Sequence, residues 1–261
     1  MRIPLIGALL LAAISQVGTA AAGDKPAPAK PTIVLVHGAF AESSSWDPVV
    51  ARLNKDGYRV IAAANPLRGV TNDAAAVARI VKSIGGPVVL VGHSYGGPVI
   101  TEAAAGNANV IALVYVSAFA PDVGESSQAL SAKFPGSTLG ANLITVALPD
   151  GDEDLYIRAD KFRDQFAADV PAAKAALMAA SQRPITLSAL GAPSRTASWK
   201  TLPSYMIYGT ADRNIPAAVM KFMAERAGAR DTVAITGASH ALMISHSSEV
   251  AAMIEEAAGA K

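Results

Sequence analysis

Residues 87–105 read PVVLVGHSYGGPVITEAAA, in which an apolar run meets a glycine-flanked serine and then an alanine-rich run. The apolar run at 87–91 is typical of a buried strand, and the alanine-rich run is typical of a helix. Ser94 therefore lies at a sharp turn from strand to helix, where Gly92 and Gly96 allow the two elements to pass closely. Such a turn strains the backbone of its serine and exposes the hydroxyl. We predict that Ser94 is a nucleophile.

Two side chains downstream of Ser94 can complete a catalytic triad. A serine hydroxyl is a poor nucleophile at neutral pH, so it needs a base, and the base needs an orienting acid. His240 follows the last predicted strand, where a loop can carry its imidazole over Ser94, and we predict it to be the base. Asp212 follows the preceding strand and is the predicted acid. Asp122 also follows a predicted strand and is the alternative acid.

Backbone amides near the predicted nucleophile can stabilise a tetrahedral intermediate. Each N–H that is fixed in place before charge develops on the substrate oxygen stabilises the transition state by about 3 kcal/mol. The amides of Ala39, in the turn after the first predicted strand, and of Tyr95 are the predicted pair. The three other histidines, His37, His93 and His246, lie in glycine-flanked turns or beside a helix and are predicted to be structural.

Strands and helices alternate along most of the chain. Apolar runs typical of buried strands lie at 32–36, 59–63, 87–91, 111–116, 204–208 and 231–235. Strands that are apolar on both faces predict an α/β fold with a mostly parallel central sheet and helices on both faces. From about 124 to 200 this alternation gives way to short helical segments and an acidic loop. We interpret this region as a small, mainly helical cap inserted into a domain of residues 32–261.

The N-terminal segment has a different composition from the rest of the chain. Residues 1–22 carry a single charge, an apolar run at 5–14 and three alanines at 20–22, the pattern of a secretory signal peptide. The apolar run is too short for a bilayer-spanning helix, which needs about 20 residues, so we expect no stable membrane insertion. Residues 23–31 are proline-rich and predict a flexible linker. The protein is therefore expected to be exported, either to a periplasm or into the medium.

Composition limits the classes of partner and cofactor. The chain has 261 residues, of which 51% are hydrophobic, and its 22 basic and 21 acidic residues nearly balance. A chain without a basic patch or a charged tail is not expected to bind nucleic acid, and a small molecule is the expected partner. The lack of cysteine excludes disulfides, thiolate metal sites and a cysteine nucleophile. The acidic cluster at 150–154 lacks the spacing of a calcium loop, so no metal is expected.

Together these motifs resemble the α/β-hydrolase superfamily over about residues 32–258. Within it, the chain is similar to small bacterial carboxylesterases and to plant methylesterases related to hydroxynitrile lyases. The motifs that carry the resemblance are VLVHGA (34–39), VGHSYGG (91–97), VSAFAPD (116–122), GTAD (209–212) and ASH (238–240).

The resemblance implies a carboxylesterase-type serine hydrolase that needs no metal or cofactor and cleaves small to medium uncharged esters. In such an enzyme Ser94 would attack the carbonyl and form an acyl-serine intermediate. His240 would take and return the proton, and Asp212 would hold the imidazole in the correct tautomer.

Other chemistries on the same triad are the alternatives to ester hydrolysis. They are perhydrolysis, acyl transfer and cyanohydrin cleavage, and a non-catalytic small-molecule binder is a further one. The lyase branch carries a threonine beside the first-strand histidine and a lysine after the catalytic histidine, where this chain has Gly38 and Ala241. These two departures favour hydrolysis over cyanide elimination.

The wall of the substrate pocket is expected to be apolar. Its predicted members are Phe40, Trp46, Phe119 and Met243, which lie near the predicted catalytic turns in the sequence. Apolar residues are buried by default, so each of them could equally belong to the core.

Overall fold

The computed structural model describes residues 30–259, so the predicted signal peptide at 1–22 and nearly all of the predicted linker at 23–31 lie outside the described residues. Its central sheet has six strands in the order β2-β1-β3-β4-β8-β9, and every pairing between them is parallel. The strands are β1 (Thr32–Val36), β2 (Val60–Ala63), β3 (Val88–His93), β4 (Val110–Val116), β8 (Ser204–Gly209) and β9 (Asp231–Ile235). The predicted α/β fold with a parallel sheet is confirmed.

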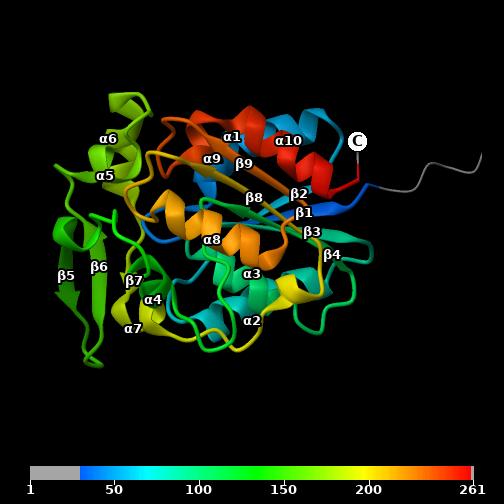
Figure 1. Ribbon diagram of the computed structural model, residues 1–261, viewed down its shortest axis with the longest axis horizontal. Coiled ribbons are helices and arrows are strands. Elements are labelled where there is room, and N and C mark those ends of the chain that lie inside the picture. The colour runs from blue at the N-terminus through cyan, green and yellow to red at the C-terminus, as the bar shows by residue number, and fades with distance from the viewer. Residues whose placement is uncertain (1–29, 260–261) are drawn as a thin grey trace, which may run out of the picture.

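Helices cover both faces of this sheet, as the apolar strands require (Figure 1). On one face lie α1 (Asp47–Lys55) and α10 (Ser247–Ala257), with the short η1 (Ser43–Trp46) and α9 (Leu242–Ser245) beside them. On the other face lie α2 (Val70–Lys82) and α3 (Gly96–Ala104), and α8 (Ala217–Ala227) packs against β8. Each long helix buries one stripe of apolar side chains. On α1, for example, Val49 and Leu53 are four residues apart and both fully buried.

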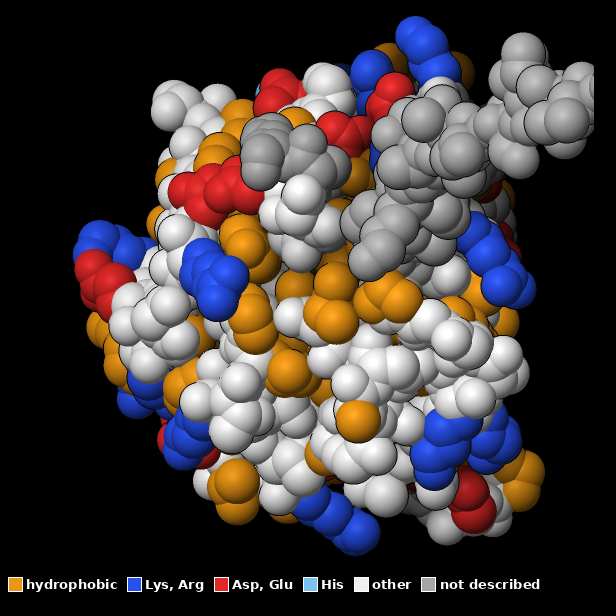
Figure 2. Space-filling view, turned by 90° about the vertical axis from the view of Figure 1, so that its right-hand side faces the viewer, with side chains coloured by type: hydrophobic (Ala, Val, Ile, Leu, Met, Phe, Trp, Pro, Cys, Tyr) orange, Lys and Arg blue, Asp and Glu red, His pale blue; other side chains and the backbone are white. Residues whose placement is uncertain are grey.

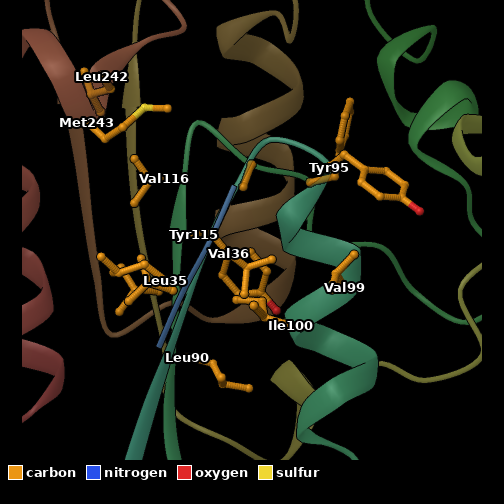
Figure 3. Packing of buried hydrophobic residues seen from close by; sticks show 14 of the residues in the cluster. Leu35, Val36, Leu90, Tyr95, Val99, Ile100, Tyr115, Val116, Leu242 and Met243 are labelled. Carbon is orange, nitrogen blue, oxygen red and sulfur yellow. The ribbon is translucent and has the colours of Figure 1, made fainter. Parts of the chain in front are cut away.

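The core consists of two apolar layers, one on each side of the sheet. Figure 3 shows Val99 and Ile100 of α3 on one side of the strands and Leu242 and Met243 of α9 on the other. All four side chains are fully buried, as is Val116 at the end of β4. Burying a side chain of this size stabilises the fold by about 1.5–3 kcal/mol. The two layers fix the strands, and with them the turns at the carboxyl ends of the strands.

The cap is inserted between β4 and β8, and most of it lies at the left in Figure 1. Its helices are α4 (Ser127–Ser131), η2 (Gly140–Asn142), α5 (Phe162–Phe166), α6 (Ala172–Ser181), α7 (Leu187–Gly191) and η3 (Ser198–Lys200). It also contains a three-stranded antiparallel sheet of β5 (Leu143–Ala147), β6 (Glu153–Ile157) and β7 (Ile185–Thr186). The sequence predicts short helical segments in this region but not the sheet. The predicted acidic loop is partly wrong, because Glu153 and Asp154 lie in β6.

The face opposite the cap carries charges of both signs. Figure 2 shows acidic and basic side chains interspersed around its margin and hydrophobic side chains in small groups between polar atoms. This mixture agrees with the near balance of 22 basic and 21 acidic residues. None of the helices within residues 30–259 is long and apolar enough to cross a membrane.

Candidate active site

Ser94 lies at the tight turn between β3 and α3. Its φ is +54°, in the left-handed region that a residue with a Cβ rarely adopts. Gly97 N and Phe119 N both donate to its carbonyl oxygen, at 3.0 and 3.2 Å, and hold the turn in place. A Cβ at Gly92 would lie 2.6 Å from Gly96 O, so only glycine permits this approach of strand and helix. The strain and the close glycines are those expected of a nucleophile-bearing turn.

Asp212 and His240 form a buried pair beyond the ends of β8 and β9. His240 Nδ1 lies 2.6 Å from Asp212 Oδ2, and both side chains are fully buried. The other carboxylate oxygen, Oδ1, accepts from the backbone N–H groups of Asn214 and Ile215 at 2.8 and 2.9 Å. Since the Asp212 carboxylate can only accept a hydrogen bond, His240 Nδ1 carries the proton and Nε2 is the free acceptor. Nε2 has no hydrogen-bond partner among the described residues.

His93, the chain neighbour of Ser94, brings His240 to the turn. His93 Nε2 donates to the backbone oxygen of His240 at 3.1 Å, and the two ring centroids are 4.7 Å apart. His93 packs against one side of the His240 ring, and Asp212 binds its Nδ1. These two contacts fix the orientation of the His240 ring. The structure therefore brings the predicted base and acid together and joins His240 to the residue before Ser94, but no hydrogen bond links His240 Nε2 to Ser94 Oγ.

Asp122, the alternative acid, lies in a different environment. Its Oδ1 accepts from Lys200 Nζ at 2.6 Å and from the backbone N–H of Val123 at 2.7 Å. The hydrogen bond from Lys200 lowers the pKa of Asp122. This carboxylate thus forms a solvent-exposed ion pair, and Asp212 is the carboxylate that contacts His240.

The two predicted oxyanion donors come from adjacent turns. A Cβ added to Gly38 would lie 2.6 Å from Ser94 Cβ and 3.1 Å from Tyr95 N, so the turn after β1 lies directly against the serine turn. Ala39 and Tyr95 both line the same cavity as Ser94. Their amide N–H groups have no acceptor among the described residues. Both donors are thus free for a ligand oxygen.

His37 and His93 have structural roles, as the sequence analysis predicted. His37 Nδ1 donates to Gly38 O at 2.9 Å, and its Nε2 accepts from the backbone N–H of Asn65 at 3.0 Å. Burial lowers the pKa of His37 to about 4 and the pKa of His93 well below its usual range. Both rings are therefore neutral at physiological pH, and His37 fixes the turn that carries Ala39.

The buried carboxylate of Asp73 is a feature that the sequence analysis missed. The Tyr95 hydroxyl donates to Asp73 Oδ2 at 2.9 Å, and the backbone N–H of Arg68 donates to the same carboxylate at 3.1 Å. Burial raises the pKa of Asp73. Asp73 anchors the Tyr95 ring and so supports the turn that holds Ser94. In the sequence it resembles any acidic residue in the first turn of a helix, so no local signal identified it.

One segment of the cap, residues 162–169, contacts both triad loops. Phe166 packs edge-on against the His240 ring, with centroids 4.9 Å apart, and its carbonyl accepts from Ala241 N at 3.0 Å. The Asp169 carboxylate accepts hydrogen bonds from the backbone N–H of Ser239, at 3.2 Å, and from the Ser239 hydroxyl. The cap therefore positions the loop that carries the predicted base.

A cavity of about 470 Å³ lies between the serine turn and the cap. Phe40 and Phe119 line it, as predicted. Trp46 and Met243 are not among its lining residues, which corrects the prediction for these two. Trp46 packs edge-on against the inner side of His93, and Met243 lies in the apolar layer under α9 (Figure 3). Both are fully buried in the core.

The rest of the cavity wall is uncharged and mostly apolar, and all of it except Asn214 and Ile215 comes from the cap. The cap contributes leucines and aromatic or small residues, namely Ala132, Phe134, Pro135, Gly136, Leu139, Gly140, Leu143, Leu155, Leu187 and Leu190. The polar members of the wall besides Ser94 and Tyr95 are Ser127, Gln128, Ser131, Ser137 and Asn214. The sequence analysis named none of these cap residues, because the folding of an insertion cannot be read from spacing.

Comparison with known proteins identifies relatives over nearly the whole described chain. Residues 33–253 match the model of the alpha/beta hydrolase family. The chain is 28% identical over 252 residues to an alpha/beta hydrolase of Aspergillus novofumigatus, which covers 88% of this chain and 97% of that protein. It is 35% identical over 113 residues to a carbendazim-hydrolysing esterase of Nocardioides sp., covering 38% of this chain and 47% of that protein.

Solved structures share the fold. Polyneuridine aldehyde esterase superposes with a TM-score of 0.76 at 20% identity, over 87% of this chain and 99% of its own. A pyrethroid hydrolase from Sphingobium faniae gives a TM-score of 0.69 at 23% identity, over 88% of this chain and 98% of its own. At these identities the likeness concerns the fold.

Proposed function

The chain belongs to the alpha/beta hydrolase family, and on this premise we propose that it is a serine esterase that cleaves uncharged carboxylic esters through an acyl-serine intermediate. The observation that carries the proposal is the buried Asp212–His240 hydrogen bond of 2.6 Å beside the strained turn of Ser94. It leaves His240 Nε2 as an acceptor without a partner among the described residues, on a histidine whose backbone oxygen is bound by His93, the residue before the strained Ser94.

In the proposed reaction, Ser94 Oγ attacks the ester carbonyl while its proton moves to His240 Nε2. The carbonyl oxygen becomes negative and accepts hydrogen bonds from the amides of Ala39 and Tyr95. Collapse of this intermediate breaks the bond to the alcohol oxygen, which takes the proton from His240. Water then attacks the acyl-serine in the same way, releases the acid and restores the hydroxyl of Ser94.

The residues that line the cavity support the proposal that the substrates are uncharged. About 470 Å³ of space is lined without a single Lys, Arg, Asp or Glu, and transfer of a charged group into such a site without a partner is strongly unfavourable. Among the similar proteins, two are esterases and one is a pyrethroid hydrolase, which supports this class. Neutral esters with apolar acyl or alcohol groups are therefore the proposed substrates.

Replacement of Ser94 tests the proposal. The Ser94→Ala variant should lower kcat/KM on p-nitrophenyl butyrate by about 10⁴-fold or more, because one missing triad member removes most of the catalytic apparatus. A fluorophosphonate probe should label the wild type at Ser94 and leave the variant unlabelled. Ser83→Ala, at an exposed serine that ends α2, is the matched control and should behave as wild type. An unchanged rate in Ser94→Ala, or a wild type that the probe does not label at pH 8, would contradict the proposal.

We also propose that the protein is exported, on the grounds of its N-terminal sequence alone. The apolar run at 5–14 and the alanines at 20–22 predict cleavage before Gly23. Mass spectrometry of the protein from its native cells should find a chain that begins at Gly23. A chain that retains its first 22 residues, isolated from the cytoplasm, would contradict export.

A further inference from the structure

The side-chain amide of Asn214 is buried on the cavity wall, and its orientation is fixed by Gln165. Gln165 Nε2 donates to the backbone oxygen of Arg213 at 2.9 Å and to Asn214 Oδ1 at 2.7 Å. Gln165 Oε1 accepts from the Asn142 amide nitrogen at 2.7 Å. The Asn142 nitrogen also donates to Thr138 O. Reversal of the Gln165 amide would therefore place its nitrogen against the Asn142 nitrogen, and reversal of the Asn214 amide would place its nitrogen against the Gln165 nitrogen.

This network leaves one donor without a partner. Since Asn214 Oδ1 is held by Gln165, the Nδ2 group points to the other side of the amide, and no described residue accepts a hydrogen bond from it. Asn214 is only 3% exposed and is one of the residues that line the cavity. Nδ2 is not one of the fully buried side-chain atoms that lack a partner, so it is open to the cavity, where a substrate acceptor can take the place of water.

A second polar group lies on the same wall. Ser127, at the start of α4, also lines the cavity, and its hydroxyl is buried without a hydrogen-bond partner among the described residues. The Ser131 hydroxyl, one turn further along α4, donates to the backbone oxygen of Asn214 at 3.4 Å, so α4 lies against the Asn214 loop. Ser127 and Asn214 therefore present two polar groups without protein partners to the same side of a cavity that has no charged side chain in its wall.

We propose that Asn214 is a specificity-determining residue that donates from Nδ2 to a neutral oxygen of the substrate, separate from the ester that is cleaved. The preferred substrates are then apolar esters that carry a second acceptor, a ketone, ether or further ester oxygen. An anion is excluded because no cationic side chain lines the cavity and because Asn214 N is bonded to the Asp212 carboxylate. This inference rests on the proposed esterase function and specifies its substrate class.

Binding to protein that cannot turn the ester over tests the inference apart from hydrolysis. In the Ser94→Ala background, calorimetry measures Kd for methyl octanoate and for methyl 4-, 5-, 6- and 7-oxo-octanoate. At least one oxo isomer should bind about tenfold more tightly than methyl octanoate, the advantage expected of one well-placed buried hydrogen bond. Asn214→Leu should reduce this advantage to within about twofold. Asn54→Leu, on the exposed face of α1, is the matched control and should retain it.

Asn214→Asp is the second variant, because it keeps the oxygen that Gln165 binds and replaces the donor with a negatively charged acceptor oxygen. It should lose the tenfold advantage as well, whether or not the leucine variant folds. Equal binding of all five esters, or an advantage that survives in Asn214→Asp, would overturn the inference. Failure of the esterase proposal has a different signature, since wild-type protein would then leave methyl octanoate intact and its Ser94 unlabelled.

Discussion

At the residue scale, the site depends on glycine where the turn after β1 meets the serine turn. Gly38 has no side chain between the two turns, and a Cβ there would lie 2.6 Å from Ser94 Cβ and 2.7 Å from His93 O. Those two atoms cannot move freely, because the backbone of Ser94 is held by two hydrogen bonds to its carbonyl oxygen. An added methyl group must therefore displace the turn that carries the Ala39 amide.

Gly38→Ala should lower kcat on p-nitrophenyl butyrate by about 10²-fold, since loss or displacement of one oxyanion donor has an effect of that size. Steady-state kinetics measure the change, and the melting temperature shows that the variant is folded. Gly85→Ala is the matched control, because a Cβ at Gly85 has open space around it. A Gly38→Ala enzyme with wild-type kcat would show that the Ala39 amide takes no part in the reaction.

The three residues of the proposed triad are predicted from the sequence because each follows a strand at a recognisable turn. Ser94 is marked by its glycines, and Asp212 and His240 by their position after the last two strands. Asp73 and Asn214 could not be predicted, because their importance comes from contacts with residues far apart in the chain. Asp73 meets Tyr95 across two helices, and Asn214 is oriented by Gln165 of the cap.

At the scale of elements, the segment from α5 to Asp169 connects the cap to the loop that carries His240. Asp169 accepts two hydrogen bonds from Ser239, the residue just before His240, and Ser239 is buried. Phe166 holds the other side of the same loop through Ala241 N. We therefore treat Asp169 as a positioning residue, which acts on the reaction only through the loop that carries the base.

Asp169→Ala should lower kcat about tenfold with little change in KM, because the His240 loop loses its anchor while the cavity wall is unaltered. It should also reduce the free energy of unfolding by about 1–3 kcal/mol, the cost of leaving a buried donor unsatisfied. Asp169→Asn keeps an acceptor oxygen and should recover part of kcat. Asp164→Ala, at an exposed position of α5, is the control. Equal loss of kcat in the alanine and asparagine variants would contradict a positioning role.

The elements of the central domain could be predicted from the sequence, whereas those of the cap could be predicted only in part. Fully buried parallel strands such as β3 are continuous apolar runs, which stand out in any window. The cap strand β5 has four exposed residues out of five, and β7 has only two residues, so neither gives such a signal. Pairing of short, exposed strands is decided by the partner strand, which lies elsewhere in the chain.

At the scale of the whole molecule, two buried neutral histidines make stability depend on pH. In the unfolded chain a histidine has a pKa of about 6.5, whereas burial lowers the pKa of His37 to about 4 in the folded protein. As the pH falls below 6.5, the unfolded chain therefore binds a proton that the folded protein does not. The free energy of unfolding is at its full value above pH 6.5 and decreases down to about pH 4, and His93 adds to the decrease in the same direction.

The free energy of unfolding of wild type should decrease between pH 7 and pH 4. In His37→Gln this decrease should be smaller by about 3 kcal/mol, the amount that corresponds to the lowered pKa of this one side chain. Glutamine can retain both hydrogen bonds, one to Gly38 O and one from Asn65 N, without titrating. Urea unfolding of each protein at pH 7, 6, 5 and 4 gives the change relative to its own value at pH 7. If His37→Gln loses as much stability as wild type over this range, then another group is responsible for the acid sensitivity of the fold.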